Sequence, residues 1–138
     1  MKQFTLGKTE RLKSRKQIER LFKEGKTITV TPFKIFYILE KELAPVSKTS
    51  SLLFGVGAGT KHFKKAVDRN RIKRLVREAY RLQRNELNVK LIENKLQLNV
   101  FFIYTGKELP LYNLVYEKLG VALQKFTKIT DEIAETNS

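Results

Sequence analysis

The sequence predicts a fold of the α+β class, an α/β sandwich built on one four-stranded sheet. Segments with alternating apolar residues and segments with helical apolar spacing follow one another in the order helix, strand, strand, strand, helix, strand, helix. The 138 residues, of which 41% are hydrophobic, are enough for one domain with one core. We expect a basic N-terminal tail over residues 1–13, a single domain over 14–127 and a flexible C-terminal tail over 128–138.

A short helix is predicted first, over residues 15–24. Ser14 and Gln17 have the spacing of a capping box, and apolar residues at helical spacing follow as far as Phe22. Gly25 suits the position just past a helix end.

The next two segments, 27–31 and 33–40, are predicted as a short edge strand and a longer strand, divided by Pro32. The alternation in the longer strand puts Phe33, Ile35, Tyr37 and Leu39 on one face and Lys34, Phe36, Ile38 and Glu40 on the other. Aromatic rings beside cations suit unpaired bases and phosphates. Packing of Phe36 against a neighbouring strand explains the same pattern equally well.

Residues 42–51 read as a loop, and residues 52–60 as a strand with Gly55, Gly57 and Gly59 on one face. A strand face made of glycines is flat, so another backbone can approach it closely. Either a helix of this protein or an RNA strand would fit there, and the sequence does not choose between them.

The last two apolar segments are predicted as a strand and a helix. Residues 96–104 are apolar on both faces, which is typical of a central strand. Pro110 suits the first turn of a final helix, whose apolar stripe reaches Phe126.

The most informative segment, residues 61–84, holds ten basic and two acidic residues. We expect its helix to begin near Phe63 or Lys64 and to extend past Leu87, with its end and a turn in residues 88–95. Its core-facing arc carries Ile72, Leu75, Val76 and Ala79, and the opposite arc, spanning roughly 100°, carries Asn70, Lys73, Arg74, Arg77, Arg81 and Arg84. Solvated helix faces usually mix charge signs, so a strip of like charges indicates a polyanionic partner such as RNA.

The charge of the whole chain points the same way. The formal net charge is +14, and all of the excess lies in residues 1–26 and 61–84. Concentration of the excess in two segments is typical of a binding surface rather than of a generally basic protein.

Few residues could carry catalysis. There is no cysteine, so disulfides and cysteine-ligated zinc are excluded, and His62 has no partner in a recognisable motif. The glycines lack a phosphate-loop arrangement, and Asp68 and Glu78 do not make a convincing metal pair. No signal peptide or membrane-spanning run is evident, and we expect a cytoplasmic protein. We expect no catalytic residue in this chain; a metal site cannot be assigned from the sequence.

Residues 66–77, Ala-Val-Asp-Arg-Asn-Arg-Ile-Lys-Arg-Leu-Val-Arg, resemble the signature of the protein subunit of bacterial ribonuclease P. The predicted element order is also that of this family, which implies a left-handed crossover where common topology favours the right-handed form. The resemblance implies a function: the RNA subunit, with magnesium ions, removes the 5′ leader of precursor tRNA, and the protein subunit binds both the RNA subunit and the leader. It further implies that the protein helps to stabilise bound magnesium and is monomeric outside the complex.

The resemblance also assigns residues to the two roles. The signature and the basic residues around it would bind the RNA subunit, namely Lys61, Lys64, Lys65, Arg69, Asn70, Arg71, Lys73, Arg74, Arg77 and Arg81. A cleft between the first helix and the sheet would hold the leader, with Ile18, Phe22, Lys34 and Phe36 corresponding to its positions. Ile18 stands where an aromatic residue is frequent in the family, and an isoleucine cannot stack on a base as a ring does.

Two other functions remain compatible with parts of the sequence. A non-catalytic structural RNA-binding protein, such as a ribosomal protein, would share the basic helix without needing the cleft. A nuclease acting alone would need a catalytic constellation that the sequence does not offer.

Overall fold

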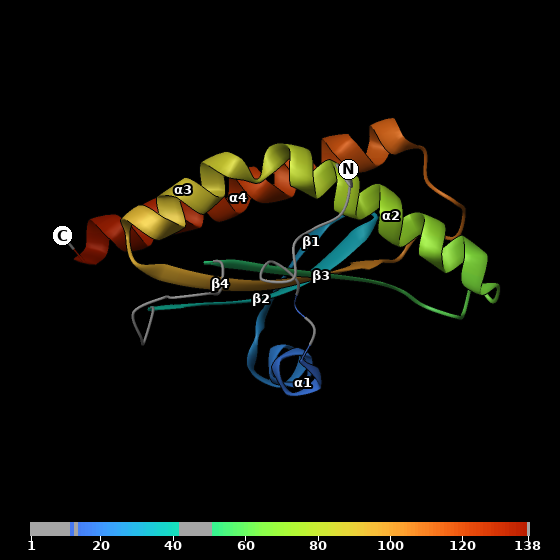
Figure 1. Ribbon diagram of the computed structural model, residues 1–138, viewed down its shortest axis with the longest axis horizontal. Helices are drawn as coiled ribbons and strands as arrows, with labels where there is room; N and C mark the ends of the chain where they lie inside the picture. The colour runs from blue at the N-terminus through green and yellow to red at the C-terminus, as the bar shows by residue number, and fades with distance from the viewer. Residues whose placement is uncertain (1–11, 13, 42–50, 138) are drawn as a thin grey trace, which may run out of the picture.

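The computed structural model describes residue 12 and residues 14–41 and 51–137. The α+β class is confirmed, with four strands and four helices in the described part of the chain (Figure 1). In chain order the elements are α1 (Arg15–Glu24), β1 (Lys26–Val30), β2 (Phe33–Lys41), β3 (Leu52–Ala58), α2 (Ala66–Gln83), α3 (Asn85–Glu93), β4 (Leu96–Tyr104) and α4 (Tyr112–Asn137). None of the helices described is long and apolar enough to cross a membrane.

The four strands form one sheet in the order β1-β2-β4-β3. β2 pairs antiparallel with both β1 and β4, and β3 pairs parallel with β4. The parallel pair is joined by a crossover through α2 and α3; its left-handed sense stays a prediction. β4 lies between two other strands, which confirms the central strand predicted from its two apolar faces.

The two faces of the sheet are covered very differently. α2, α3 and α4 lie together on one face, and α1 lies alone on the other (Figure 1). The main core fills the first layer and includes Phe54 and Phe102 from the sheet with Ile72, Val76 and Phe126 from the helices. On the α1 side, the buried hydrophobic residues of the described chain form a small second cluster of Leu12, Leu21 and Leu53. Most of the burial that stabilises the fold is therefore on the three-helix side.

The predicted single basic helix is two helices. α2 ends at Gln83 and α3 begins at Asn85, where the sequence predicted an uninterrupted helix past Leu87 and a turn in residues 88–95. The break falls at Arg84, which keeps a right-handed helical conformation. No glycine or proline marks it in the sequence. The sequence pattern conceals it because Leu87 and Leu91 continue the helical apolar spacing and are fully buried.

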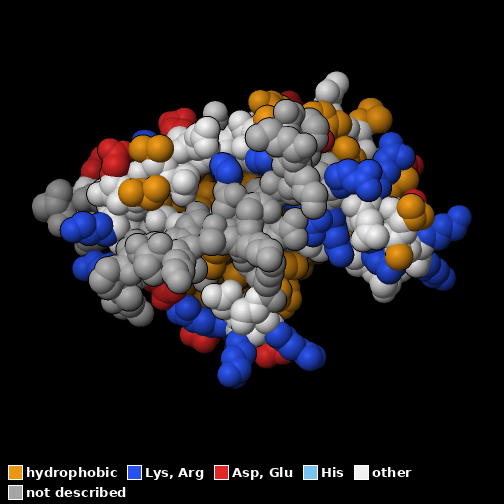
Figure 2. Space-filling view, viewed as in Figure 1, with side chains coloured by type: hydrophobic (Ala, Val, Ile, Leu, Met, Phe, Trp, Pro, Cys, Tyr) orange, Lys and Arg blue, Asp and Glu red, His pale blue; other side chains and the backbone are white. Residues whose placement is uncertain are grey.

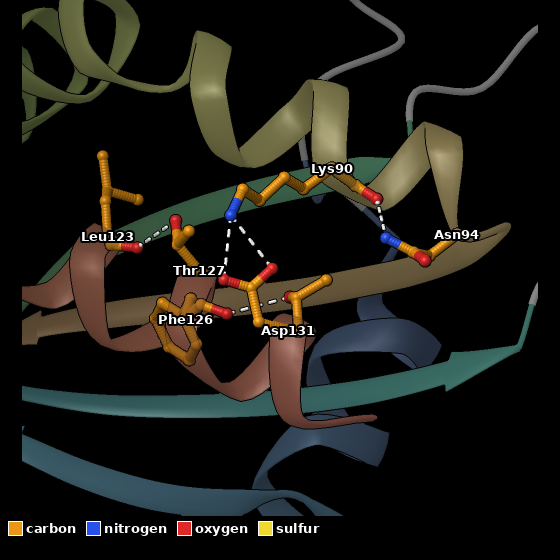
Figure 3. Close-up of polar contacts among 7 residues, drawn as sticks. Lys90, Asn94, Leu123, Phe126, Thr127 and Asp131 are labelled. Carbon is orange, nitrogen blue, oxygen red and sulfur yellow. Dashed lines mark hydrogen bonds and ion pairs between the residues drawn. The ribbon is translucent and has the colours of Figure 1, made fainter. Parts of the chain in front are cut away.

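The predicted flexible C-terminal tail is also corrected. α4 begins at Tyr112, two residues after Pro110, and continues as helix to Asn137. The Lys90 ammonium of α3 contacts both carboxylate oxygens of Asp131 of α4, at 2.8 and 2.9 Å (Figure 3). Thr130 is fully buried, and its hydroxyl donates to the carbonyl of Phe126 at 2.8 Å. These contacts hold α4 on the domain as far as Asp131, so the packed helix continues beyond the predicted boundary at residue 127.

The start of the domain agrees with its capping signal. The Ser14 hydroxyl accepts a hydrogen bond from the Gln17 amide at 3.4 Å. Gly25 ends α1 in an extended conformation, and a Cβ there would collide with the Leu21 carbonyl oxygen, so close approach explains this glycine. The predictions for the tail 1–13 and the loop 42–51 fall outside the described residues, apart from Leu12 and Ser51. The Leu12 amide donates to the Phe54 carbonyl at 3.0 Å, which places residue 12 along the outer edge of β3.

Candidate nucleic-acid interface

The first candidate surface is the part of the sheet that α1 leaves open. Ile18 and Leu21 of α1 pack in the small cluster with Leu53 of β3 and Ile38 of β2. Farther along the strands, the same face carries residues that are half-buried or exposed: Lys34, Phe36, Gly57, Phe101 and Ile103. α1 therefore shields one end of this face and leaves the other end accessible.

Three aromatic rings meet at the border of the open area. Phe22 of α1 contacts Phe36 of β2 edge-to-face, with ring centroids 4.9 Å apart and an interplanar angle of 68°. Phe22 also contacts Phe101 of β4, at 5.4 Å and 86°. The Lys34 ammonium lies 5.2 Å from the centroid of the Phe36 ring. We call Phe22, Phe36 and Phe101 the aromatic cluster; despite its contacts, Phe22 is 46% exposed.

The structure brings together three of the four side chains predicted to form the leader site. Phe22, Phe36 and Lys34 share one surface, and Ile18 is half-buried and packs, as Phe101 does, against the small apolar cluster. Phe101 completes the aromatic cluster and was not assigned to the site from the sequence. The signal for it is the strand register, in which Phe101 pairs directly with Phe36. That register needs the strand order, which the residue pattern does not give.

The glycine face of β3 is filled from within the sheet. A Cβ at Gly55 would lie 2.6 Å from Cδ2 of Phe101, and a Cβ at Gly57 would lie 3.1 Å from Cε1 of the same ring. The sequence left open whether a helix or an RNA strand approaches these glycines. For Gly55 and Gly57 the approaching group is neither of these: it is the Phe101 side chain of the neighbouring strand β4. The same ring also contacts Phe22.

One ion pair ties α1 to the sheet. The Arg20 guanidinium donates to both carboxylate oxygens of Glu40 on β2, at 2.9 and 3.0 Å. The hydrogen bond and charge of Arg20 hold the pKa of Glu40 below its usual range, and Glu40 in turn raises the pKa of Arg20. Arg20 also lies 4.0 Å from Glu24 of its own helix. Part of the positive charge of residues 1–26 is thus paired with carboxylates of the protein itself.

The second candidate surface is the basic helix. Its predicted core arc is confirmed, since Ile72, Val76 and Ala79 are fully buried and Leu75 packs against the core. Tyr80 fixes the helix over β3 by stacking on Phe54, with centroids 3.9 Å apart and planes at 12°. Exposed basic and polar positions on and before α2 are Lys61, Lys64, Lys65, Asn70, Arg71 and Arg74, and half-buried ones are Lys73, Arg77, Arg81 and Arg84. Lysine and arginine side chains gather around α1 and over the N-terminal half of α2, and the surface is notched between them (Figure 2).

Arg69 of the signature has a bond pattern of its own. Its Nη1 donates to the carbonyls of Phe63 and Lys64, both at 2.8 Å. These bonds fix the turn that precedes α2 and carries Lys64 and Lys65. Because Phe63 is buried beneath this turn, Arg69 also holds a core residue in place. Arg69 therefore supports the basic surface from within, a role that the sequence did not predict.

The two surfaces adjoin at one end of the sheet. Lys34, Ile103 and Gly57 are aligned across β2, β4 and β3 by their register. One residue later β3 ends, and the turn with Lys61, Lys64 and Lys65 leads into α2. A polyanion lying on the basic turn can thus continue onto the open sheet face.

In the described part of the chain, no group of three or more His, Cys, Asp or Glu side chains is placed to hold a metal ion. The acids nearest the basic face, Asp68 and Glu78, lie ten residues apart on α2. The carboxylates of the described residues are therefore not clustered as a protein-only magnesium site would need.

Comparison with known proteins decides the family. A family model described as Ribonuclease P matches residues 6–127. The chain belongs to the ribonuclease P protein family. A ribonuclease P protein component from Porphyromonas gingivalis is 42% identical over 120 residues, which cover 87% of this chain and 85% of the relative. One from Chlorobium phaeobacteroides is 33% identical over 126 residues, covering 84% of each chain.

Solved structures agree with the fold. The ribonuclease P protein from Thermotoga maritima superposes with a TM-score of 0.61 and 26% identity, covering 84% of this chain and 96% of that one. A Staphylococcus aureus ribonuclease P protein structure superposes with a TM-score of 0.60 at 18% identity, covering 86% and 95%. At that identity the second likeness concerns the fold alone.

Proposed function

We propose that this chain is the protein subunit of ribonuclease P and that it acts in the cytoplasm on precursor tRNA, together with a catalytic RNA subunit. The observation that carries the proposal is the junction of two surfaces: a basic helix and turn beside an aromatic cluster on a half-open sheet face. The first suits a folded RNA, and the second suits an unpaired strand that leaves it.

The basic surface would bind the RNA subunit. Its exposed arginines and lysines neutralise phosphates and release counterions, which gives tight but salt-dependent binding. Arg69 preorganises the turn before α2, so little ordering is needed when RNA binds. Asn70 is exposed between Arg69 and Arg71 and can both donate to and accept from a 2′-hydroxyl.

The aromatic cluster would bind the 5′ leader. Bases stack on exposed aromatic faces with little sequence preference, and Lys34 adds a charge for the phosphates. Mature tRNA has no leader, so these contacts favour the precursor over the product. We call this area, formed by the aromatic cluster and Lys34, the leader surface.

The chemistry is proposed to belong to the RNA subunit. Hydrolysis of the phosphodiester bond needs a positioned nucleophile and charge stabilisation, for which magnesium ions held chiefly by RNA would serve. The protein's part is to hold both RNAs. No step is assigned to a side chain of this protein.

The test is cleavage of a precursor tRNA by a bacterial ribonuclease P RNA at low magnesium concentration, with and without this protein. We expect faster cleavage at the 5′ end of the mature sequence, and loss of the effect when Arg71 and Arg74 are both replaced by alanine. Tight RNA binding without any stimulation would instead favour a structural RNA-binding protein. Cleavage by the protein alone, surviving repurification, would favour a nuclease acting without RNA.

A further inference from the structure

We propose that Arg20 and Glu40 form a positioning pair that sets how closely α1 lies on the sheet and thereby shapes the leader surface. The inference rests on the proposed function of that surface. It assigns to Arg20, a basic residue in an RNA-binding segment, a role other than contact with RNA.

The apolar cluster under α1 is small. α1 has ten residues, and Leu21 is its only buried side chain, resting on a cluster completed by Leu12 and Leu53. Ile18 packs against the same cluster and the Phe22 ring contacts Phe36 and Phe101, so three side chains of α1 rest on the sheet. Apolar contacts of this kind are not directional, and they define the tilt of a short helix less closely than a directional bond does.

The Arg20–Glu40 pair has the geometry to do this. Two parallel N–H···O bonds join the planar guanidinium to the planar carboxylate, at 2.9 and 3.0 Å, and such a fork fixes orientation as well as distance. Among the hydrogen bonds and ion pairs that α1 side chains form with the described residues, these alone reach the sheet. Glu40 gives Arg20 a fixed partner, because β2 is paired with β4 along its whole length.

Each member of the pair is connected to the aromatic cluster by a short segment of its own element. Phe22 follows Arg20 by two residues on α1, and Phe36 precedes Glu40 by four residues on the same face of β2. A tilt of α1 therefore moves the Phe22 ring relative to Phe36 and Phe101, which it now contacts at 4.9 and 5.4 Å. The fork keeps these edge-to-face contacts in place before the leader arrives.

The charges of the pair also matter for a nucleic acid. Glu40 lies on the face that would carry the leader, and an unpaired carboxylate there would repel phosphates. With Arg20 bound to it, the pair is neutral as a whole. A phosphate ligand role for Arg20 makes the opposite prediction, because release from Glu40 would then make the arginine more available.

The experiment measures the dissociation constants of precursor and mature tRNA for the complex of this protein with a ribonuclease P RNA. The variants are Glu40→Gln, Arg20→Gln and the exchange Arg20→Glu with Glu40→Arg. We expect each single change to weaken precursor binding about three- to five-fold and to spare mature tRNA, and the exchange to restore most of the loss. Arg15→Gln is the matched control, because among the described residues Arg15 pairs with Glu19 of the same helix, at 3.3 Å and on the exposed surface, and not with the sheet.

A second readout follows the geometry without RNA. Magnetisation transfer between the Phe22 and Phe36 rings, measured by NMR in the free protein, should weaken in Glu40→Gln and return in the exchanged variant. A merely stabilising surface pair would leave this signal unchanged.

The results separate this inference from the proposed function. If the unmodified complex does not prefer precursor to mature tRNA, the leader surface itself is refuted. If it does prefer the precursor and Glu40→Gln binds it equally well or more tightly, the positioning role is overturned and only the leader surface stands.

Discussion

Replacement of Gly55 by alanine tests the leader surface through Phe101, the side chain that lies against this glycine. A Cβ at residue 55 would lie 2.6 and 2.9 Å from Cδ2 and Cε2 of Phe101. Carbon atoms in contact prefer about 3.5–4.0 Å, so the ring must move by roughly 1 Å. The movement carries Phe101 away from β3 and disturbs its contact with Phe22.

The cost follows from two opposing effects. Overpacking of this kind costs about 1–3 kcal/mol, while replacing glycine by alanine in an extended strand returns about 0.4–1 kcal/mol through the unfolded chain. We expect Gly55→Ala to lower the free energy of unfolding by about 1–2 kcal/mol. Urea unfolding at equilibrium measures this directly, and the affinity for precursor tRNA should fall with it.

The other glycines of the strand provide graded controls. At Gly57 the nearest ring atom would be 3.1 Å from a Cβ, so a smaller loss is expected, and at Gly59 nothing lies within 4 Å, so alanine there should be neutral or slightly stabilising. A clash between residue 55 and Phe101 would be refuted if Gly55→Ala cost no more unfolding free energy than Gly59→Ala. It would also be refuted if the cost of Gly55→Ala were unchanged when Phe101 is leucine.

Three further predictions concern other parts of the molecule. Arg74→Ala should weaken binding to the RNA subunit and lower the slope of log affinity against log salt by about one unit, and an unchanged slope would rule out a phosphate contact. Lys95 has a φ of 54°, so Lys95→Gly should raise the free energy of unfolding by up to about 1 kcal/mol and Lys95→Val should lower it; changes of the same sign would contradict this. Glu40 has a lowered pKa, so its pairing should stabilise the protein above about pH 4.3 and lose this effect as the pH falls through that lowered pKa. Urea unfolding should therefore show Glu40→Gln to be less stable than the unchanged protein by under about 1 kcal/mol near pH 7 and equally stable near pH 2, and a constant difference would disprove the linkage.

The strands and their faces could be predicted because period-2 alternation is a local property. The faces of residues 33–40 and 52–58 lie as the alternation predicts, and the core arc of the basic helix is buried. Local spacing also explains the two failures in the helices. The apolar repeat runs through the break at Arg84 without a change, and it persists weakly in residues 128–137, where Ile129 and Ile133 pack on the core amid polar neighbours.

The sequence could predict only those parts of the candidate site that depend on residues within one segment. Phe22 and Phe36 could be assigned through the family resemblance, but Phe101 becomes part of the cluster through pairing between β2 and β4, which are far apart in the sequence. The two bonds of Arg69 to the turn before α2 depend on how that turn folds back. A signature shows which residues matter, and the structure separates those that face outward from those that support them.

The most direct test of the account is the affinity of the assembled complex for precursor tRNAs with leaders of increasing length, compared between the unchanged protein and Phe36→Ala. Affinity should rise with the first several leader nucleotides and then level off, and Phe36→Ala should remove most of this rise while leaving mature tRNA binding unchanged. A rise of equal size in both proteins, or an equal loss for precursor and mature tRNA, would contradict the assignment of the leader to this face of the sheet.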